Sequence, residues 1–195
     1  MTRRRLIIFL KEPRLGRVKT RLAADIGSVA ATNWYRHQST RLINRLERDP
    51  RWQVELAVSP DRATSSRCWP LHLLRYGQGG GGLGERMARA LKVGQGPTIL
   101  IGADIPNVTP GHIADAFHRL AGADAVFGPA NDGGFWLVGL SHPAHAPRHL
   151  FANARWSTPH AMADAAATMK GGRIAYAQQM TDVDNGADLR ATLRR

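Results

Sequence analysis

Seven short segments of the chain carry runs of apolar residues bounded by glycine, proline or polar residues. The first, LIIFL at residues 6–10, is apolar throughout, which is typical of a strand covered on both faces. The same pattern predicts six further strands: QVELAVS (53–59), LHLLRY (71–76), TILIGAD (98–104), DAVFGPA (124–130), FWLVGLS (135–141) and RIAYAQQM (173–180).

Apolar residues at helical spacing fill the stretches between these segments. In residues 83–94, Leu83, Met87 and Leu91 fall four apart and share one helical face. Residues 109–122 combine Thr109 as an N-cap with Pro110 at the first helical position, which predicts a helix start. Further helices are expected over residues 29–48, 157–172 and 185–195.

Strands that alternate with helices favour parallel pairing with right-handed crossovers. The sequence therefore predicts an α/β fold: a three-layer α/β/α sandwich with a mostly parallel, mixed sheet. Its 195 residues suffice for one well-buried core, so we expect residues 1–195 to form a single domain.

The composition is that of a soluble globular protein. Hydrophobic residues make up 43% of the chain, and no apolar run approaches the roughly 20 residues that cross a bilayer. The single Cys68 cannot form an internal disulfide, which agrees with a reducing compartment. We expect a cytoplasmic protein with no membrane partner.

The formal net charge of +12 calls for an anionic partner or a well-solvated basic surface. The basic residues are spread along the chain without aromatic interleaving or a recognisable nucleic-acid motif, so nucleic acid is an unlikely partner. Attraction of phosphorylated small molecules is the functional alternative, because a basic cleft concentrates anions.

A basic loop follows the first predicted strand. KEPRLGRVKTR, residues 11–21, contains Gly16, which lets the backbone approach an anion, and Thr20, which is expected to cap the next helix. Its charged donors are Lys11, Arg14, Arg17, Lys19 and Arg21. The loop lacks the Walker A and dinucleotide fingerprints, so the pattern predicts a phosphate cradle or a solvated basic turn.

Three carboxylates follow predicted strands, where open α/β sheets bind ligands. Asp104 ends an apolar strand and is the first candidate ligand for Mg²⁺ or Mn²⁺, the alternative being a turn with Pro106. Asp132 lies in the turn-forming NDGG sequence. Asp184 either joins Asp104 on one cation or caps the last helix through the amides of residues 186 and 187.

Six motifs in order, spanning nearly the whole chain, carry a resemblance to a known family. They are FLKEPRLGRVKTRL, GLGERMARAL, IGADIPNVTP, GPANDGGFWLVGL, RWSTPHAM and DVDNGADL. The chain resembles a bacterial family of glycosyltransferase-like proteins of unknown function, also described as radical-SAM/selenodomain-associated transferases. That family is similar to phospholactate and molybdenum-cofactor guanylyltransferases, which share the Rossmann-like nucleotide-diphospho-sugar transferase (GT-A) fold.

The resemblance implies roles for several residues. The loop from Lys11 to Arg21 would hold nucleotide phosphates, Asp104 would be the strand-end metal ligand, and Asp184 would resemble the second metal ligand of sugar nucleotidyltransferases. The match at Asp184 departs from the usual pattern, because NGAD replaces TPED after it. Two further departures leave the base and the donor open: the G-x-G-T-R loop is missing, and QGGGGLGER has glycine where an acidic or polar residue is expected before LGER.

The sequence-based hypothesis is a Mg²⁺-dependent transferase that uses a nucleoside triphosphate or a nucleotide sugar. Nucleotidyl transfer to a phosphorylated small-molecule acceptor is favoured because five basic residues in one loop suit a triphosphate. Lys19 and Arg21 are expected to stabilise charge that develops during transfer. Glu85 and Arg86 are expected near the nucleotide.

Two alternatives stay open. In a glycosyltransferase on the same fold, Asp132 would act as base or acceptor contact. In a noncatalytic binding module, nucleotides and Mg²⁺ would have no effect. Trp136 and Trp156 are expected either to line the acceptor pocket or to belong to the core.

Overall fold

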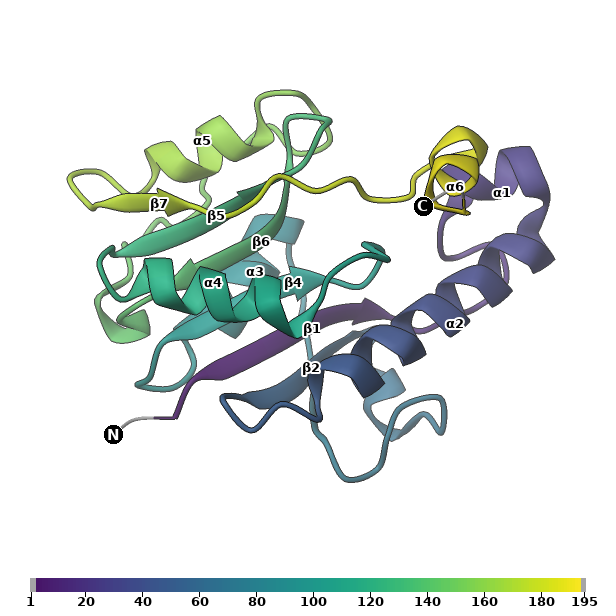
Figure 1. Ribbon diagram of the computed structural model, residues 1–195, viewed down its shortest axis with the longest axis horizontal. Helices are drawn as coiled ribbons and strands as arrows, with labels where there is room; N and C mark the ends of the chain where they lie inside the picture. The colour runs from purple at the N-terminus through teal and green to yellow at the C-terminus, as the bar shows by residue number, and fades with distance from the viewer. Residues whose placement is uncertain (1–2, 194–195) are drawn as a thin grey trace.

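The computed structural model describes residues 3–193 of the chain, and its centre is a seven-stranded mixed sheet (Figure 1). The strands are β1 (Arg5–Lys11), β2 (Gln53–Ser59), β3 (Leu74–Gly77), β4 (Thr98–Gly102), β5 (Ala125–Pro129), β6 (Phe135–Leu140) and β7 (Ile174–Tyr176). The α-helices of the described residues are α1 (Thr20–Ile26), α2 (Ser28–Leu46), α3 (Leu83–Lys92), α4 (Pro110–Leu120), α5 (Ala161–Ala167) and α6 (Gly186–Leu193). Short 3₁₀ helices span Asp61–Ser65 and Pro143–His145.

The strand order β3-β2-β1-β4-β6-β5-β7 places β1 and β4 near the centre. β1 pairs in parallel with β2 and β4, and β5 pairs in parallel with β7, whereas β6 is antiparallel to both of its neighbours. The mostly parallel, mixed sheet that the sequence predicts is therefore confirmed. Parallel strands bring their carboxyl ends to one edge of the sheet, where loops from distant parts of the chain meet.

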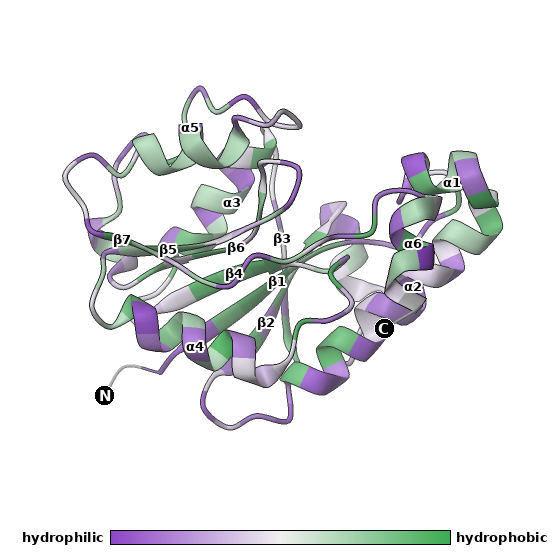
Figure 2. Ribbon diagram, turned by 45° about the horizontal axis from the view of Figure 1, so that its top comes forward, coloured by the Kyte–Doolittle hydropathy of each residue, from purple (hydrophilic) through white to green (hydrophobic). Residues whose placement is uncertain are grey.

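Alternating side chains of β1 belong to two hydrophobic clusters. Figure 2 shows α3 and α5 on one side of the sheet and α4 on the other. Leu6, Ile8 and Leu10 join a cluster with residues of α2 and α4. Ile7 joins the opposite cluster, with residues of α3 and α5. Since β1 is covered on both faces, its apolar run is continuous rather than alternating, and the α/β/α sandwich follows from that burial.

A third, smaller cluster joins the two ends of the chain. Leu22 of α1, Ala31 of α2 and Val183 before α6 are fully buried against one another. The segment after β7 crosses the molecule to reach α6, which lies beside α1 (Figure 1). This packing brings the C-terminal segment against the basic loop after β1.

The start of α1 differs from the expectation that Thr20 caps it. Thr20 is the first residue of the helix, and the N-cap is Lys19, which makes no side-chain capping bond. Gly27, at φ 85°, separates α1 from α2. For α4 the expectation is confirmed, because the Thr109 side chain accepts a hydrogen bond from the His112 amide.

Several elements are shorter than their sequence patterns predict. The strand expected at 173–180 spans only Ile174–Tyr176, because its pairing with β5 is limited to these residues. The strand expected at 71–76 begins at Leu74, because pairing with β2 starts there, and Leu71 lies outside it with 78% of its surface exposed. The helix expected from residue 157 begins at Ala161, because Ser157 has a positive φ of 61° that interrupts helical geometry. Within residues 3–193, no helix is long and apolar enough to cross a membrane.

Candidate functional site

A cavity of about 710 Å³ opens at the carboxyl ends of β1 and β4. Its lining comes from the end of β1, the start of α1, the loop after β4, the β5–β6 turn, residues 156–161 and the segment before α6. Gln78 and the first turns of α3 close another side. The cavity is therefore the place where the predicted strand-end loops meet.

Three carboxylates gather at one end of this cavity. One oxygen of each of Asp104, Asp182 and Asp184 lies within 4.8 Å of the others, and all three residues are half-buried. Asp104 follows β4, and the other two lie on the extended segment that precedes α6. The structure thus brings together Asp104 and Asp184, as the shared-cation prediction requires.

Backbone pairing and one buried side chain set the position of the C-terminal carboxylates. The amide of Met180 donates to the carbonyl of Pro129, and the amide of Val183 donates to the carbonyl of Asp104 at 3.2 Å. Val183 is fully buried in the cluster with α1 and α2. Because side chains alternate along an extended segment, Asp182 and Asp184 both face away from Val183 and toward the cavity.

The helix-capping alternative for Asp184 is wrong. The Asn185 side chain accepts hydrogen bonds from the amides of Ala187 and Asp188, at 2.8 and 3.0 Å, and so caps α6. The carboxylate of Asp184 instead contacts Lys19 Nζ at 2.7 Å and the guanidinium of Arg21 at 3.1 Å.

Lys19 is the basic residue most closely tied to the carboxylates. Its backbone is left-handed, with φ 46° and ψ 49°, and its ammonium lies 2.7 Å from Asp104 Oδ2 and 2.7 Å from Asp184 Oδ1. Burial by itself lowers the pKa of Lys19, but the carboxylates of Asp104 and Asp184 outweigh it, so that its pKa lies above the ordinary value. Lys19 is therefore charged at neutral pH and pairs with both carboxylates.

Asp182 is a site residue that the sequence reasoning missed. Burial, and then the charges of Asp184 and Asp104, raise the pKa of Asp182 to about 6. The signal in the sequence is the D-x-D spacing of TDVD, which places both carboxylates on one side of an extended segment with Val183 on the other.

The predicted phosphate-binding residues divide between the cavity and the surface. Lys11, Lys19, Thr20, Arg21 and Arg86 line the cavity, whereas Gly16 and Glu85 are not among its lining residues. Gly16 lies in the exposed turn of the basic loop with φ 70°. Their roles toward a nucleotide stay predictions.

The start of α3 explains the different positions of its two predicted residues. The carboxylate of Glu85 accepts a hydrogen bond from the Gly82 amide at 2.7 Å, which caps the helix. Arg86 donates to the side chain of Gln78 at 2.9 Å, and Gln78 donates in turn to the carbonyls of Leu10 and Ala57. Arg86 is thus anchored at the cavity through a buried amide.

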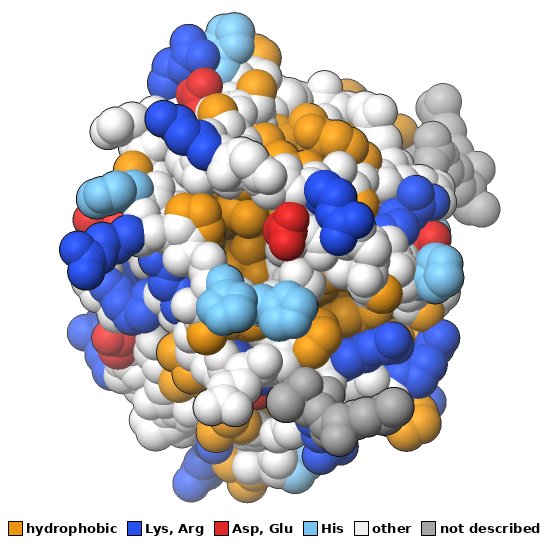
Figure 3. Space-filling view, turned by 90° about the vertical axis from the view of Figure 1, so that its left-hand side faces the viewer, with side chains coloured by type: hydrophobic (Ala, Val, Ile, Leu, Met, Phe, Trp, Pro, Cys, Tyr) orange, Lys and Arg blue, Asp and Glu red, His pale blue; other side chains and the backbone are white. Residues whose placement is uncertain are grey.

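The remaining basic residues of the loop point elsewhere. Arg14 pairs with Glu12, and Arg17 is exposed and outside the cavity lining. On the face of the molecule shown in Figure 3, Lys and Arg side chains are spread among other types. A part of the positive charge is therefore ordinary solvated surface.

A second wall of the cavity is formed by the β5–β6 turn and residues 156–161. Asp132 lines the cavity while its Oδ1 accepts a hydrogen bond from the Gly134 amide at 2.9 Å, so it also stabilises the turn. The Met162 amide donates to the Gly133 carbonyl at 3.0 Å, which ties the two parts of the wall together.

Two tryptophans reach this wall. Trp136 is buried, and its indole N–H donates to the Gln178 carbonyl at 3.0 Å. Trp156 is half-buried and lies close to Gly84 of α3, where a β-carbon would come within 2.8 Å of the indole ring. Both tryptophans also line the cavity, so each of them combines the two expected positions, in the core and at the cavity surface.

The donor set fits a hard divalent cation. Mg²⁺ and Mn²⁺ prefer oxygen ligands, and one or two carboxylates together with substrate phosphates are the usual arrangement for Mg²⁺. Asp104, Asp182 and Asp184 supply carboxylate oxygens close enough to share one cation, directly or through water. The contact of a Lys19 ammonium with two of them shows that this end of the cavity stabilises positive charge.

Comparison with protein-family models assigns the chain to a family. The model of the bacterial family described as "uncharacterized protein conserved in bacteria (DUF2064)" matches residues 42–158. No curated protein matches the sequence.

Three solved structures show the fold. A provisionally assigned nucleotide-diphospho-sugar transferase from Desulfovibrio desulfuricans has a TM-score of 0.88 at 27% identity, over 100% of this chain and 87% of that chain. The 4-diphosphocytidyl-2C-methyl-D-erythritol synthase of Anaerococcus prevotii has a TM-score of 0.65 at 8% identity, over 100% and 97%. Rv0371c of Mycobacterium tuberculosis, in complex with manganese, has a TM-score of 0.54 at 14% identity, over 99% of each chain.

Proposed function

Because the chain belongs to the DUF2064 family and has the fold of nucleotide-diphospho-sugar transferases, we propose that it is a transferase that acts with a divalent cation on a nucleotide. The favoured reaction is nucleotidyl transfer from a nucleoside triphosphate to a phosphorylated small molecule. The observation that carries the proposal is the meeting of Asp104, Asp182 and Asp184 with Lys19 and Arg21 at one end of the cavity.

The charge of the cavity supports a ligand that brings its own metal ion. Four basic side chains line it, Lys11, Lys19, Arg21 and Arg86, and so do four carboxylates, those of Asp104, Asp132, Asp182 and Asp184. The carboxylates would repel a bare phosphate chain. A divalent cation would reduce this repulsion, since it adds two positive charges where the carboxylates of Asp104, Asp182 and Asp184 lie.

The bond changes of the favoured reaction need little covalent participation by the protein. An oxygen of the acceptor phosphate forms a bond to the α-phosphorus, the bond from that phosphorus to the bridging oxygen breaks, and pyrophosphate leaves. When bound, the cation neutralises phosphate charge and orients the reacting groups. Lys19 and Arg21 add positive charge beside the leaving phosphates, and Arg86 lies on the α3 side of the same cavity.

The second wall, formed by the β5–β6 turn and residues 156–161, suits the part of an acceptor that carries no phosphate. Among the described residues that line the cavity, those of the β5–β6 turn and of 156–161 include no Lys or Arg, whereas they include Trp156, Ser157 and Thr158. An acceptor would therefore place its phosphate at the metal end and its remaining surface against this wall.

Glycosyl transfer from a nucleotide sugar is the second candidate. It is favoured by the exposed carboxylate of Asp132 on the cavity wall and by the similarity to the Desulfovibrio protein. In that reaction Asp132 would contact or deprotonate an acceptor hydroxyl. A nucleoside triphosphate then releases no pyrophosphate, which separates the two candidates.

The test is a thermal-shift screen of the four nucleoside triphosphates and common nucleotide sugars, each with and without Mg²⁺. A ligand at a hundred times its Kd adds about 2.7 kcal/mol to the free energy of unfolding, or about 5 to 10 °C in Tm for a chain of this size. Asp104→Asn is expected to lose the Mg²⁺-dependent part of the shift, because it deletes a ligand charge and keeps the side-chain shape.

Asp115→Asn is the matched control, since Asp115 lies on α4, pairs with Arg119 and is not among the cavity lining. It is expected to keep the full shift. A screen in which no nucleotide shifts the wild-type Tm in a Mg²⁺-dependent manner would instead support the noncatalytic alternative. Pyrophosphate release from the triphosphate that binds, with candidate phosphorylated acceptors, then identifies the reaction.

A further inference from the structure

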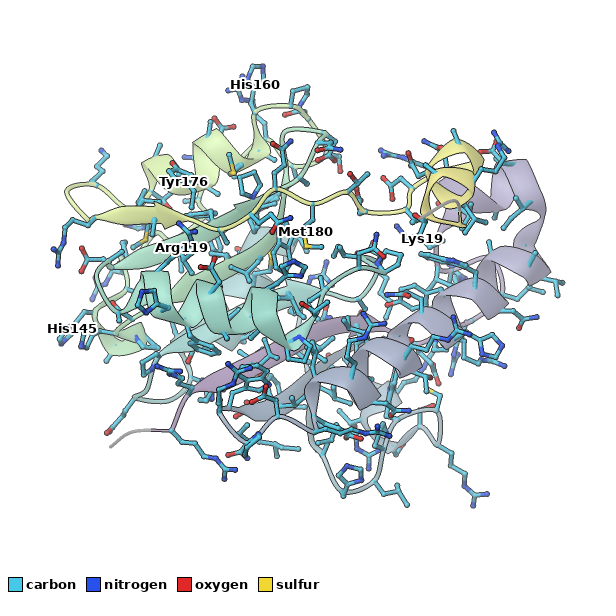
Figure 4. The ribbon with its side chains drawn as sticks, in the orientation of Figure 1. Lys19, Arg119, His145, His160, Tyr176 and Met180 are labelled. Atoms are coloured by element: carbon cyan, nitrogen blue, oxygen red, sulfur yellow. The ribbon has the colours of Figure 1, made fainter. Side chains whose placement is uncertain are left out.

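The ammonium of Lys19 lies where a cation shared by Asp104 and Asp184 would lie. It contacts one oxygen of each carboxylate at 2.7 Å, and its side chain is only 8% exposed. Figure 4 shows Lys19 where the segment before α6 passes α1. Among the basic residues that line the cavity, Arg21 contacts Asp184 alone, and no ion pair with a described carboxylate joins Lys11 or Arg86.

A divalent cation and this ammonium compete for the same oxygens. Mg²⁺ binds carboxylate oxygen at about 2.0–2.1 Å. A cation bound to Asp104 and Asp184 would then lie within a few ångströms of the Lys19 nitrogen, and two positive charges that close repel strongly in a partly buried site. Direct coordination by both carboxylates therefore requires the ammonium to move away.

Lys19 can move without any change of the backbone. The four-carbon stem of a lysine has several rotatable bonds, so the ammonium can turn away while the Lys19 backbone stays at the N-cap of α1. The described residues that line the cavity offer the displaced ammonium one further carboxylate, that of Asp132, besides those of Asp104, Asp182 and Asp184 (the aspartate triad). The phosphates of an incoming ligand are the complementary partner.

We propose that Lys19 is a built-in counter-cation: a divalent cation displaces it from Asp104 and Asp184, and the phosphates of the ligand receive it. This inference rests on the proposed function, because it assumes that the triad binds a metal ion together with a phosphate chain. It adds a property of the site, which is that metal and phosphate bind cooperatively and that each alone binds weakly. Coupling between two sites is typically about 5- to 150-fold and is reciprocal.

The proposal makes an unusual prediction for Lys19→Met. Removal of a basic residue near a phosphate site ordinarily weakens ligand binding and nothing else. Here the substitution is expected to tighten the binding of Mn²⁺ alone by at least 5-fold, since no ammonium competes with it. It is also expected to abolish most of the cooperativity between Mn²⁺ and phosphate.

Two measurements on the full-length chain test this, and neither depends on activity. Electron paramagnetic resonance of free Mn²⁺ gives the Kd of Mn²⁺ alone. Thermal unfolding with Mn²⁺, with tripolyphosphate and with both gives the cooperativity as the excess of the joint Tm shift over the two separate shifts. Tripolyphosphate serves as the probe because it carries the phosphate chain without a base.

Two variants control for charge and for folding. Arg17→Met removes the same charge from the same loop, and Arg17 is exposed and outside the cavity lining, so the Kd of Mn²⁺ should change less than 2-fold. Lys19→Arg keeps a cation near the carboxylates, so it should not bind Mn²⁺ more tightly than the wild type. Unfolding curves without ligand establish that each variant is folded.

Tighter binding of Mn²⁺ alone by Lys19→Met, with reduced cooperativity, supports the proposal. Unchanged or weaker binding of Mn²⁺ by that variant, while the wild type still binds Mn²⁺ with tripolyphosphate, overturns the counter-cation role and leaves the proposed function standing. Absence of Mn²⁺ binding to the wild type under all conditions overturns both.

Discussion

Replacement of Asp182 by asparagine is expected to stabilise the metal-depleted protein while it weakens the divalent-cation site. Asp182 is half-buried beside Asp104 and Asp184, and its oxygen lies within 4.8 Å of an oxygen of each. Lys19 contacts the other two carboxylates directly but forms no ion pair with Asp182. The negative charge of Asp182 is therefore the least compensated of the three carboxylates.

The magnitude follows from the shifted pKa. Burial, followed by the neighbouring carboxylates, raises the pKa of Asp182 from 3.8 to about 6. Each pH unit of difference corresponds to about 1.4 kcal/mol, so the ionised group costs at most about 3 kcal/mol of unfolding free energy. Because solvent screens this half-buried carboxylate and the three carboxylates titrate together, we expect about 1–2 kcal/mol for Asp182→Asn, or about 2 to 8 °C in Tm.

The sign of the pH dependence is fixed by the raised pKa. Below 3.8 the carboxyl is protonated in both the folded and the unfolded chain, and it costs nothing. As pH rises toward 6, the unfolded chain loses its proton first, so the cost grows and then stays constant above about 6. The advantage of Asp182→Asn should therefore be about three times larger at pH 8 than at pH 4.5.

The assay is thermal unfolding in the presence of a chelator at several pH values, with Asp115→Asn as the control. Asp115, whose side chain is 43% exposed, pairs with Arg119 on α4, so its replacement should give no stabilisation at pH 8. Addition of Mn²⁺ should then raise the Tm of Asp182→Asn less than that of the wild type. A variant that is no more stable than the wild type at pH 8 would refute the argument that Asp182 is an uncompensated charge.

Three further substitutions test the scaffold by thermal or denaturant unfolding. Glu55→Gln should cost about 1.5–3 kcal/mol, because it removes the charge of the buried Glu55 that pairs with the half-buried Arg5, and a loss below 1 kcal/mol would show that water solvates this pair. Thr109→Ala should cost about 1 kcal/mol through loss of the α4 cap, and an unchanged Tm would contradict that role. Gly133→Ala should cost at least about 2 kcal/mol, because Gly133 has φ 84° and a β-carbon would lie 2.2 Å from the Pro159 carbonyl oxygen; full stability would mean that the wall is not rigid.

Local patterns in the sequence determine most of the secondary structure and the class of fold. The apolar run of β1 reflects burial on both faces, and the Thr109-Pro110 pair specifies the start of α4 through bonds that close within a few residues. The placement of Asp104 after an apolar strand is equally local, and it suffices to put a carboxylate at the ligand-binding edge of a parallel sheet.

Local patterns are less informative where pairing with a distant strand sets the limits of an element. The pattern of LHLLRY predicts a strand over six residues, but only the part that lies beside β2 becomes a strand. The left-handed backbone of Lys19 likewise has no signature in the sequence, since Lys is not a residue type that favours it. Tertiary contacts stabilise both features.

The chemistry of the site depends on contacts that only the tertiary structure decides. Lys19 meets Asp184 across 165 positions of sequence, and the Val183 amide fixes that segment by its bond to the Asp104 carbonyl. The strand order and the burial of Val183 between α1 and α2 bring Lys19 and Asp184 together, and neither feature produces a periodic pattern in the sequence. Hydrophobic periodicity records which face of an element is buried, but it carries no information on which distant element covers that face.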